Sequence, residues 1–273
     1  MKKLLLTGAS GFIGKNLIKY LDNYKVIAIV NKNKIEEKTN LYQIKLDLNN
    51  FLLLENLIKE EKPEILIHLA WITDNKTYLN SQGNLKWLSI SKKLIDLFIK
   101  NNGKKLLVAG SCAEDYFKET LYSKTKANLK DYCFSKNIDI TWLKIFFPFG
   151  PGDKKEKLIP SIINSGLKNK DFYLKEPENI IDYIYIDDLV FIIYKVLKEN
   201  KLGTVEIGTG KGYKLIDIAN KIYNLIGSNA KINYNKRHKD RKIIVSKPVY
   251  YIENNIDDKL ENTIKYHICY NNY

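Results

Sequence analysis

The sequence has few of the residues that form disulfide frameworks or metal centres. It contains 3 cysteines, Cys112, Cys133 and Cys269, and 3 histidines, and none stands at the spacing of a metal-binding motif. No stretch reaches the ~18 apolar residues of a membrane-spanning helix, and the leucines after Met1-Lys2-Lys3 are too few for a signal peptide. We therefore expect a cytoplasmic protein with free thiols, no metal and no membrane partner.

Arginine is also scarce, with only Arg237 and Arg241 among 45 basic residues. The formal net charge of +14 would suit an anionic partner. However, the lysines are scattered along the whole chain rather than gathered into a stripe that could follow a phosphate backbone. We expect no nucleic-acid partner, but a general attraction for small anions.

Apolar runs alternate with stretches of helical periodicity over the first half of the chain. The runs lie at 2–7, 25–30, 41–46, 65–69, 105–110 and 139–146. Such alternation with short connections predicts a parallel sheet covered by helices on both faces. The predicted fold class is therefore α/β, with a doubly wound sheet of the Rossmann type.

The pattern changes to shorter elements after residue 150. It predicts helices near 156–168, 187–199 and 215–227 and strands at 180–186 and 204–207, whereas the chain from 229 onward reads as basic and irregular. We expect a dinucleotide-binding domain at 1–150 and a smaller α/β substrate lobe at 151–273. The two parts are expected to be interleaved, with the lobe closing over the carboxyl edge of the sheet, where open α/β sheets bind ligands.

A glycine-rich turn directly follows the first apolar run. Glycines at 8, 11 and 14 suit a tight turn, close approach to a pyrophosphate and close packing of helix on strand. The helix that follows offers backbone N–H groups to an anion. We expect a dinucleotide to bind through Gly8, Ser10, Gly11, Phe12, Ile13 and Gly14.

The ends of the next strands indicate which dinucleotide is bound. Asn31 and Lys32 follow the second strand, where an acidic residue would bond the ribose of NAD, so we favour NADPH over NADH. Asp47 and Leu48 follow the third strand and are expected near the adenine. Leu69 and Ala70 follow the fourth and should present their backbone to the cofactor. His68, on an apolar strand, is interpreted as a core residue.

A serine, a tyrosine and a lysine follow the fifth strand. Tyr122 and Lys126 share a helix face, where the ammonium could lower the phenol pKa, and Ser111 could bond the same substrate oxygen. The Tyr-x-x-x-Lys spacing alone is weak evidence, because the 19 tyrosines also give Tyr132/Lys136 and Tyr194/Lys198. Position after the strand-end serine favours Tyr122. This set is suited to hydride transfer at carbon with proton transfer at oxygen.

Several blocks in the expected order resemble the extended short-chain dehydrogenases/reductases of the nucleotide-sugar epimerase/dehydratase family. The blocks are 7–14, 68–70, Asn84, 110–112, 122–126, 146–151, 182–189 and 205–210. The resemblance implies a nucleotide-diphosphate sugar substrate, a homodimer, catalysis by Ser111, Tyr122 and Lys126, and a loop starting at Phe146 beside the nicotinamide. We assign Trp71, Asn84 and Cys112 to the substrate side, and Arg237 and Arg241 to the substrate diphosphate.

Catalytic residues that related enzymes carry and this chain lacks narrow the choice of reaction. Sugar 4,6-dehydratases carry an Asp-Glu pair after the catalytic hydroxyl, where this chain has Cys112-Ala113. A shift of one residue would put Cys112 in the place of the hydroxyl and still leave no pair. Dual epimerase-reductases use a cysteine and a histidine that are not evident here. The Ser-Cys-Ala-Glu string at 111–114 resembles 4-ketoreductases of the CDP-abequose and paratose synthase type.

We therefore expect NADPH-dependent reduction of the 4-keto group of a nucleotide-linked 6-deoxy or dideoxy sugar, in the biosynthesis of surface-polysaccharide sugars. Two alternatives stay open. One is a 4-epimerase with tightly bound NAD. The other is a non-catalytic NADP(H)-sensing regulator, although such proteins usually lose the tyrosine or lysine that this chain keeps.

Overall fold

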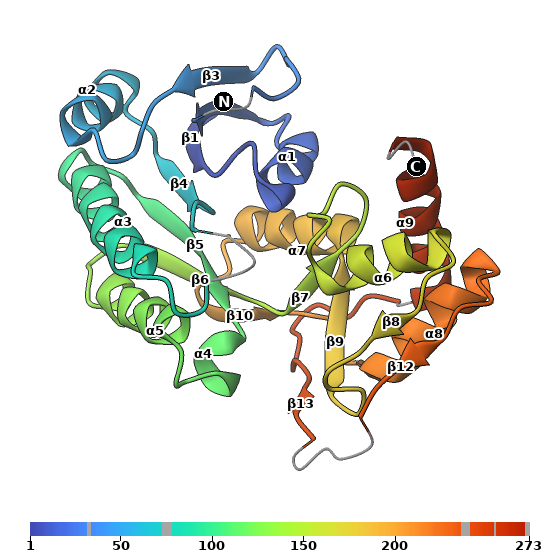
Figure 1. Cartoon of the computed structure of the whole chain (residues 1–273). Helices are drawn as coiled ribbons and strands as arrows, with labels where there is room; N and C mark the ends of the chain where they lie inside the picture. Colours follow the sequence, from blue (N-terminus) through green and yellow to red (C-terminus); the bar gives the residue numbers. More distant parts are fainter. Residues whose placement is uncertain (32–33, 73–77, 236–240, 254, 271–273) are drawn as a thin grey trace. The chain divides into compact units, whose positions relative to one another are not determined.

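A computed structural model describes residues 1–31, 34–72, 78–235, 241–253 and 255–270 (Figure 1). The chain forms two compact units, Met1–Ile145 with Val190–Val205, and Phe146–Leu189 with Glu206–Tyr273. Residues 190–205 belong to the first unit, although they follow part of the second unit in the sequence. Among the described residues, no helix combines the length and apolar character needed to cross a membrane.

A seven-stranded sheet forms the centre of the first unit. Its strands are β1 (Lys2–Thr7), β2 (Tyr24–Val30), β3 (Leu41–Lys45), β4 (Ile65–His68), β5 (Lys105–Ser111), β6 (Asp139–Ile145) and β10 (Gly203–Ile207). The strand order is β10-β6-β5-β4-β1-β2-β3, and neighbours among the first six strands are parallel. The predicted doubly wound α/β fold is confirmed, and each predicted strand of this domain is present.

Helices bury the sheet because its strands are apolar on both faces. The helices are α1 (Phe12–Leu17), α2 (Phe51–Glu61), α3 (Gly83–Lys100), α5 (Leu121–Phe134) and α7 (Ile186–Lys198), with a 3-10 turn at Ile18–Tyr20. Helices α2, α3 and α5 lie side by side and cover one face (Figure 1). On that face Leu5, Leu66 and Leu106 are in register and fully buried. Tyr20 of the 3-10 turn packs against Tyr194 of α7.

The second unit is built around β9 (Ile180–Tyr185). This strand pairs with β7 (Phe147–Phe149), β11 (Gly212–Lys214) and β13 (Ile243–Ile244), and a separate pair joins β8 (Phe172–Tyr173) to β12 (Ile232–Asn233). Helices α6 (Leu158–Leu167), α8 (Leu215–Ile226) and α9 (Ile256–Tyr270) pack against one another. The unit is therefore a small α/β structure of its own.

The expectation of an irregular chain from residue 229 onward is wrong. Helix α9 occupies 15 residues of that segment. Its buried side chains include Ile256, Leu260 and Ile264, which recur every four residues and so form one face of the helix. The residues between them are mostly polar or charged, and this dilution hid the apolar stripe in the sequence.

A buried carboxylate connects three segments of the second unit. Asp182 of β9 is 0% exposed and accepts hydrogen bonds from the backbone N–H groups of Thr209, Gly210 and Ser246. The hydroxyls of Thr209 and Ser246 also donate to it, at 2.6 and 2.5 Å. Removal of the carboxylate would leave the backbone N–H groups of Thr209 and Ser246 and the Ser246 hydroxyl without this acceptor. Gly210 N and the Thr209 hydroxyl would each keep one other acceptor, Ser246 Oγ and the Lys211 carbonyl.

We expect Asp182→Ala to lower the free energy of unfolding by about 3–5 kcal/mol, because buried donors would be left without acceptors. Urea unfolding of the full chain measures the effect. Asp171→Ala is the matched control, since Asp171 accepts from Lys231 N and Asn233 Nδ2 at an exposed position. Equal losses in the two variants would contradict the role given to Asp182.

Candidate active site

The glycine-rich turn after β1 lies against the segment that follows β4. Gly8 has a φ of +71°, and a Cβ there would come 2.8 Å from the backbone nitrogen of Ala70 and 2.9 Å from the carbonyl carbon of Leu69. At Gly14 a Cβ would come 2.3 Å from the Gly8 carbonyl oxygen. Backbone atoms cannot move aside as the end of a side chain can, so both positions require glycine.

The remaining predicted cofactor residues of this turn lie at its surface. Gly11 is exposed, and its N–H donates to the Gly8 carbonyl at 3.0 Å. Ser10, Phe12 and Ile13 are half-buried. The structure therefore brings the glycine-rich turn and residues 69–70 together at one edge of the sheet.

His68 is a core residue, as the sequence indicates. It is 2% exposed and bridges Thr7 Oγ1 at 2.6 Å and Ser91 Oγ at 2.8 Å. Burial, and then the nearby Lys126 ammonium, lower its pKa to about 3. A neutral imidazole between two hydroxyls fixes the end of β4.

The residues after β2 and β3 have different environments. Asn31 is exposed, and Lys32 lies outside the described residues. The Asp47 side chain accepts from the backbone and side chain of Asn49, which lowers the pKa of the carboxyl. Leu48 is buried in the core beneath α2 and α3. Asp47 thus organises its own turn, while Leu48 anchors that turn to the sheet.

Helix α5 places Tyr122 in its first turn. Thr120 caps the helix by accepting from Ser123 N at 3.2 Å. The Tyr122 phenol forms a side-chain hydrogen bond with Ser111, and its ring meets the edge of Tyr78 at 5.2 Å between centroids. Ser111 ends β5, so the strand end and the helix start deliver the two hydroxyls to one point.

Lys126 lies one helical turn further along and is 3% exposed. Its ammonium donates to the Ala109 carbonyl at 2.8 Å and lies 3.8 Å from the centre of the Trp71 ring. Burial lowers the lysine pKa to about 7, while the Glu114 carboxylate acts in the opposite direction. The ammonium is 6.0 Å from the centre of the Tyr122 ring.

The expectation that Lys126 makes the Tyr122 phenol acidic is not met in this arrangement. Burial raises the pKa of Tyr122, and the hydrogen bond with Ser111 offsets this only in part. Tyr78 and Glu114 raise it further. The reason is geometric, because the ammonium faces the Ala109 carbonyl and the Trp71 ring.

The other two Tyr-x-x-x-Lys pairs lie elsewhere. Tyr132 donates to Asp96, and Lys136 forms an ion pair with the same carboxylate at 2.8 Å. Tyr194 packs against Tyr20. Neither pair is near the end of β5, in agreement with their interpretation as surface or core tyrosines.

Asn84, assigned to the substrate side, is fully buried and connects three segments. Its Oδ1 accepts from the Trp71 indole at 2.9 Å, and its Nδ2 donates to the carbonyls of Tyr78 and Ser81. Trp71 in turn lies against Lys126, and Tyr78 lies against Tyr122. Asn84 therefore orients both aromatic neighbours of the Tyr–Lys pair.

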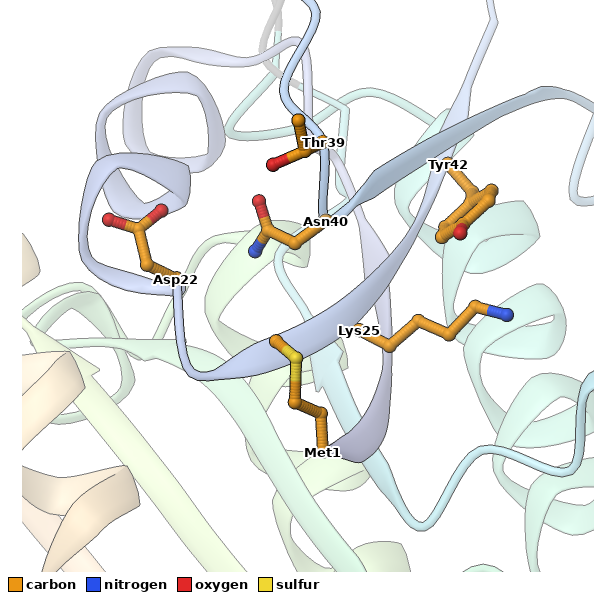
Figure 2. A pocket seen from close by; sticks show the side chains of 6 residues that line it. All are labelled: Met1, Asp22, Lys25, Thr39, Asn40 and Tyr42. Atoms are coloured by element: carbon orange, nitrogen blue, oxygen red, sulfur yellow. The ribbon is translucent and has the colours of Figure 1, made fainter.

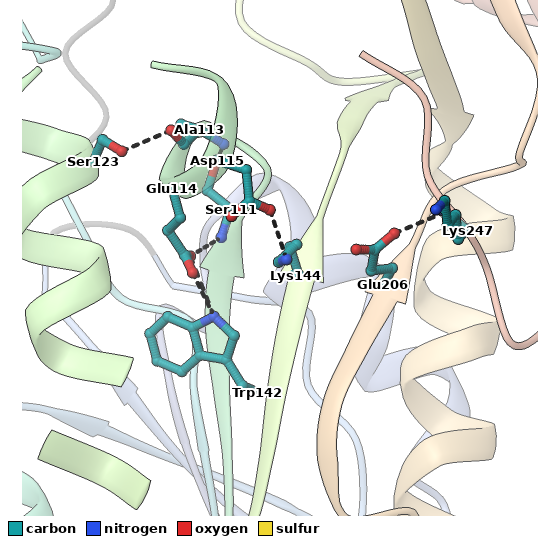
Figure 3. A network of polar contacts seen from close by, with 9 residues as sticks. All are labelled: Ser111, Ala113, Glu114, Asp115, Ser123, Trp142, Lys144, Glu206 and Lys247. Carbon is teal, nitrogen blue, oxygen red and sulfur yellow. Dashed lines mark hydrogen bonds and ion pairs between the residues drawn. The ribbon is translucent and has the colours of Figure 1, made fainter. Parts of the chain in front are cut away.

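Sequence reasoning missed Glu114 and Trp142 as parts of this site. Glu114 lies on the short helix α4 (Ala113–Tyr116), and its carboxylate accepts from Ser111 N at 2.6 Å and from the Trp142 indole at 3.0 Å (Figure 3). Gly110 leaves space for this contact, since a Cβ there would lie 2.1 Å from Trp142 Nε1. The acidic residue three places after Ser111 was visible in the sequence, but its partner on β6 was not.

The remaining assigned residues are distributed over both units. Cys112 is buried next to Ser111, and its thiol influences the pKa values of Tyr78 and Tyr122, so it belongs to the same cluster. Phe146 is buried in the second unit, where Arg241 is exposed. Arg237 lies outside the described residues.

A separate hollow of about 570 Å³ opens at the opposite edge of the sheet (Figure 2). It is lined by Met1, Asp22, Lys25, Thr39, Asn40 and Tyr42. Met1 precedes β1, and Lys25 and Tyr42 lie near the amino ends of β2 and β3. This hollow is therefore distinct from the cluster at the carboxyl ends.

Comparisons with known proteins agree with the resemblance seen in the motifs. The model of the NAD dependent epimerase/dehydratase family matches residues 4–208. The CDP-abequose synthase of Salmonella typhimurium is 31% identical over 235 residues, covering 78% of this chain and 77% of that protein. The GDP-6-deoxy-D-talose 4-dehydrogenase of Aggregatibacter actinomycetemcomitans is 25% identical over 270 residues, covering 90% and 88%.

A solved structure shows the same fold over the whole chain. The UDP-N-acetylglucosamine 4-epimerase from Methanobrevibacter ruminantium M1 superimposes with a TM-score of 0.83 at 22% identity, and 98% of each chain is covered. Together with the match of the family model over most of the sequence, these findings show that the chain belongs to the NAD-dependent epimerase/dehydratase family.

Proposed function

We propose that the protein is an NADPH-dependent reductase of the 4-keto group of a nucleotide-diphosphate-linked 6-deoxy or dideoxy sugar. The observation that carries the proposal is the meeting of Ser111, Tyr122 and Lys126 at the carboxyl end of β5. The choice of reduction is supported by the lack of an Asp-Glu pair after Ser111 and by the similarity to CDP-abequose synthase.

The residues at the edge of the sheet fit a dinucleotide. Gly11 is exposed on the turn, and a Cβ there would project into the space that a pyrophosphate needs, with only the Gly8 oxygen within 4 Å, at 3.1 Å. Residues 8 and 10–14 would hold the pyrophosphate, with Asn31, Lys32, Asp47 and Leu48 near the adenosine part and Leu69, Ala70 and Phe146 near the nicotinamide half. When bound, NADPH supplies the hydride.

The protein's own side chains would handle the proton and the charge. The Tyr122 phenol would donate its proton to the oxygen of the sugar ketone, and the Ser111 hydroxyl would hydrogen-bond the same oxygen. The raised pKa of Tyr122 keeps the phenol protonated at neutral pH, as a proton donor requires. Lys126 would contribute positive charge near the cofactor and the phenol.

A 4-epimerase is the second candidate, because solved structures of nucleotide-sugar 4-epimerases share the fold. An epimerase keeps NAD bound and regenerates it in each turnover, whereas a reductase consumes NADPH. The two functions therefore differ in net cofactor use rather than in the Ser–Tyr–Lys set.

Loss of NADPH absorbance in the presence of a panel of 4-keto-6-deoxy nucleotide sugars tests the proposal. We expect stoichiometric oxidation of NADPH with at least one CDP-, GDP- or dTDP-linked ketone, and slower oxidation of NADH. Purified protein that carries NAD and interconverts 4-epimers without consuming NADPH would establish the alternative.

We expect Tyr122→Phe to lower kcat by ~10²-fold or more, because it removes the proton donor, with a modest change in NADPH affinity. Tyr132→Phe is the matched control, since Tyr132 also belongs to a Tyr-x-x-x-Lys pair but bonds Asp96. Steady-state kinetics and fluorescence titration with NADPH provide the two measurements. Similar kcat values for the two variants would remove Tyr122 from its role.

We expect Gly11→Ala to weaken NADPH binding by about tenfold with a smaller loss of thermal stability than Gly8→Ala, because the added methyl enters the pyrophosphate space and meets a single backbone atom, the Gly8 oxygen, at 3.1 Å. Gly8→Ala should lower both, since its Cβ would meet backbone atoms at 2.8 Å. Fluorescence titration and thermal unfolding distinguish the two effects. Unaltered NADPH affinity in Gly11→Ala would place the pyrophosphate elsewhere.

A further inference from the structure

Glu114 is a buried acid with an unusual set of neighbours. It is 8% exposed, and its carboxylate accepts from the Ser111 N–H and the Trp142 indole N–H (Figure 3). Both partners are donors, so the carboxylate form is the one that satisfies them. The site thus contains a buried carboxyl group in direct contact with the backbone of Ser111.

The contacts of this carboxylate fix the turn that carries Ser111. Ser111 Oγ accepts from Ala113 N at 3.2 Å, and the Ala113 carbonyl accepts from Ser123 of α5 at 2.6 Å. Trp142 attaches the same turn to β6 through Glu114. The turn is therefore held from β6 on one side and from α5 on the other, which sets the distance between Ser111 and Tyr122.

The charge of Glu114 also acts on the Tyr–Lys pair. It raises the pKa values of both Lys126 and Tyr122. Cys133 of α5 also affects the pKa of Lys126, and Tyr78 and Cys112 affect the pKa of Tyr122. Lys126 in turn affects the pKa of His68 on β4, and Lys130 affects that of Glu114. His68 stays neutral at neutral pH. Burial raises the pKa of Glu114 itself, while the hydrogen bonds from Ser111 N and the Trp142 indole and the charges of Lys126 and Lys130 act to lower it.

We propose that Glu114 is a positioning residue that fixes the Ser111 turn and balances the Lys126 ammonium, so that both the serine hydroxyl and the positive charge are in place for catalysis. This inference rests on the proposed Ser–Tyr–Lys chemistry. Glu114 acts through its contacts with Ser111 and Trp142.

Glu114→Gln tests both parts of the inference. We expect kcat to fall by about tenfold, because Gln cannot accept from both N–H donors without opposing one of them. Loss of the charge should lower the pKa values of Lys126 and Tyr122. Reduction requires both groups protonated, so the alkaline limb of the kcat–pH profile should move to lower pH by about half a unit or more.

Asp115→Asn is the matched control. Asp115 is on the same helix and forms an ion pair with Lys144 at 2.7 Å, with half of its side chain exposed. This variant should keep the wild-type kcat and pH profile. Trp142→Phe keeps the Glu114 charge but removes the indole donor, so it should lower kcat without moving the alkaline limb. A Glu114→Gln profile that matches Asp115→Asn would overturn the inference.

Two measurements do not depend on turnover. The chain has 3 tryptophans, so the Trp142 indole N–H resonance is assigned by its absence in Trp142→Phe. We expect it to move in Glu114→Gln and to stay in Asp115→Asn, and an unmoved resonance would overturn the contact. NADPH affinity should begin to weaken at lower pH in Glu114→Gln than in the wild type, because Lys126 loses its proton earlier, and identical pH dependence would overturn the charge effect.

These measurements separate the inference from the proposed function. A wild-type protein that reduces no keto sugar, while the indole resonance and the NADPH titration change as expected, would contradict the reductase and support the role of Glu114. A wild-type protein that reduces a keto sugar, but in which Glu114→Gln leaves the kcat–pH profile, the indole resonance and the NADPH titration unchanged, would support the reductase and contradict the role of Glu114.

Discussion

Burial of both faces of the seven-stranded sheet determines where polar groups can lie in the first unit. Leu5, Leu66 and Leu106 are in register and fully buried under α2, α3 and α5. A polar side chain in the middle of such a strand would need a buried partner of its own. The chemistry-bearing residues therefore occur where the strands end, and parallel strands all end at the same edge.

The buried polar side chains described at that edge contact hydrogen-bonding or aromatic partners from other segments of the chain. His68 has two hydroxyls, Asn84 has one indole and two carbonyls, and Lys126 has a carbonyl and an aromatic face. Two buried carboxylates among the described residues, Asp182 and Glu114, show two ways of meeting this requirement. Asp182 is surrounded by neutral N–H and O–H donors, which suits a permanent structural anchor. Glu114 shares its surroundings with an ammonium, so its charge is coupled to the protonation of Lys126.

Much of the fold was predictable because the apolar runs in the sequence coincide with the strands of the sheet. The apolar runs gave all six strands β1 to β6, and the strand-end serine selected Tyr122 from three tyrosines with the same spacing. Helix α9 was missed because its apolar face, Ile256, Leu260 and Ile264, is diluted by charged residues. Trp142 and Asn84 act through contacts distant in sequence, and no local pattern shows which side chain an indole or amide will meet across a sheet edge.

The environment of Tyr122 also bears on the direction of the reaction. Oxidation of a sugar alcohol requires the phenolate as a base, whereas reduction of a ketone requires the phenol as an acid. In a site where burial, Tyr78 and Glu114 all raise the phenol pKa, the acid form is the stable one at neutral pH. A 4-epimerase must alternate between the two forms in each turnover, whereas a reductase begins each turnover from the protonated one. The raised pKa of Tyr122 therefore suits the reduction proposed above, in which the phenol is the proton donor.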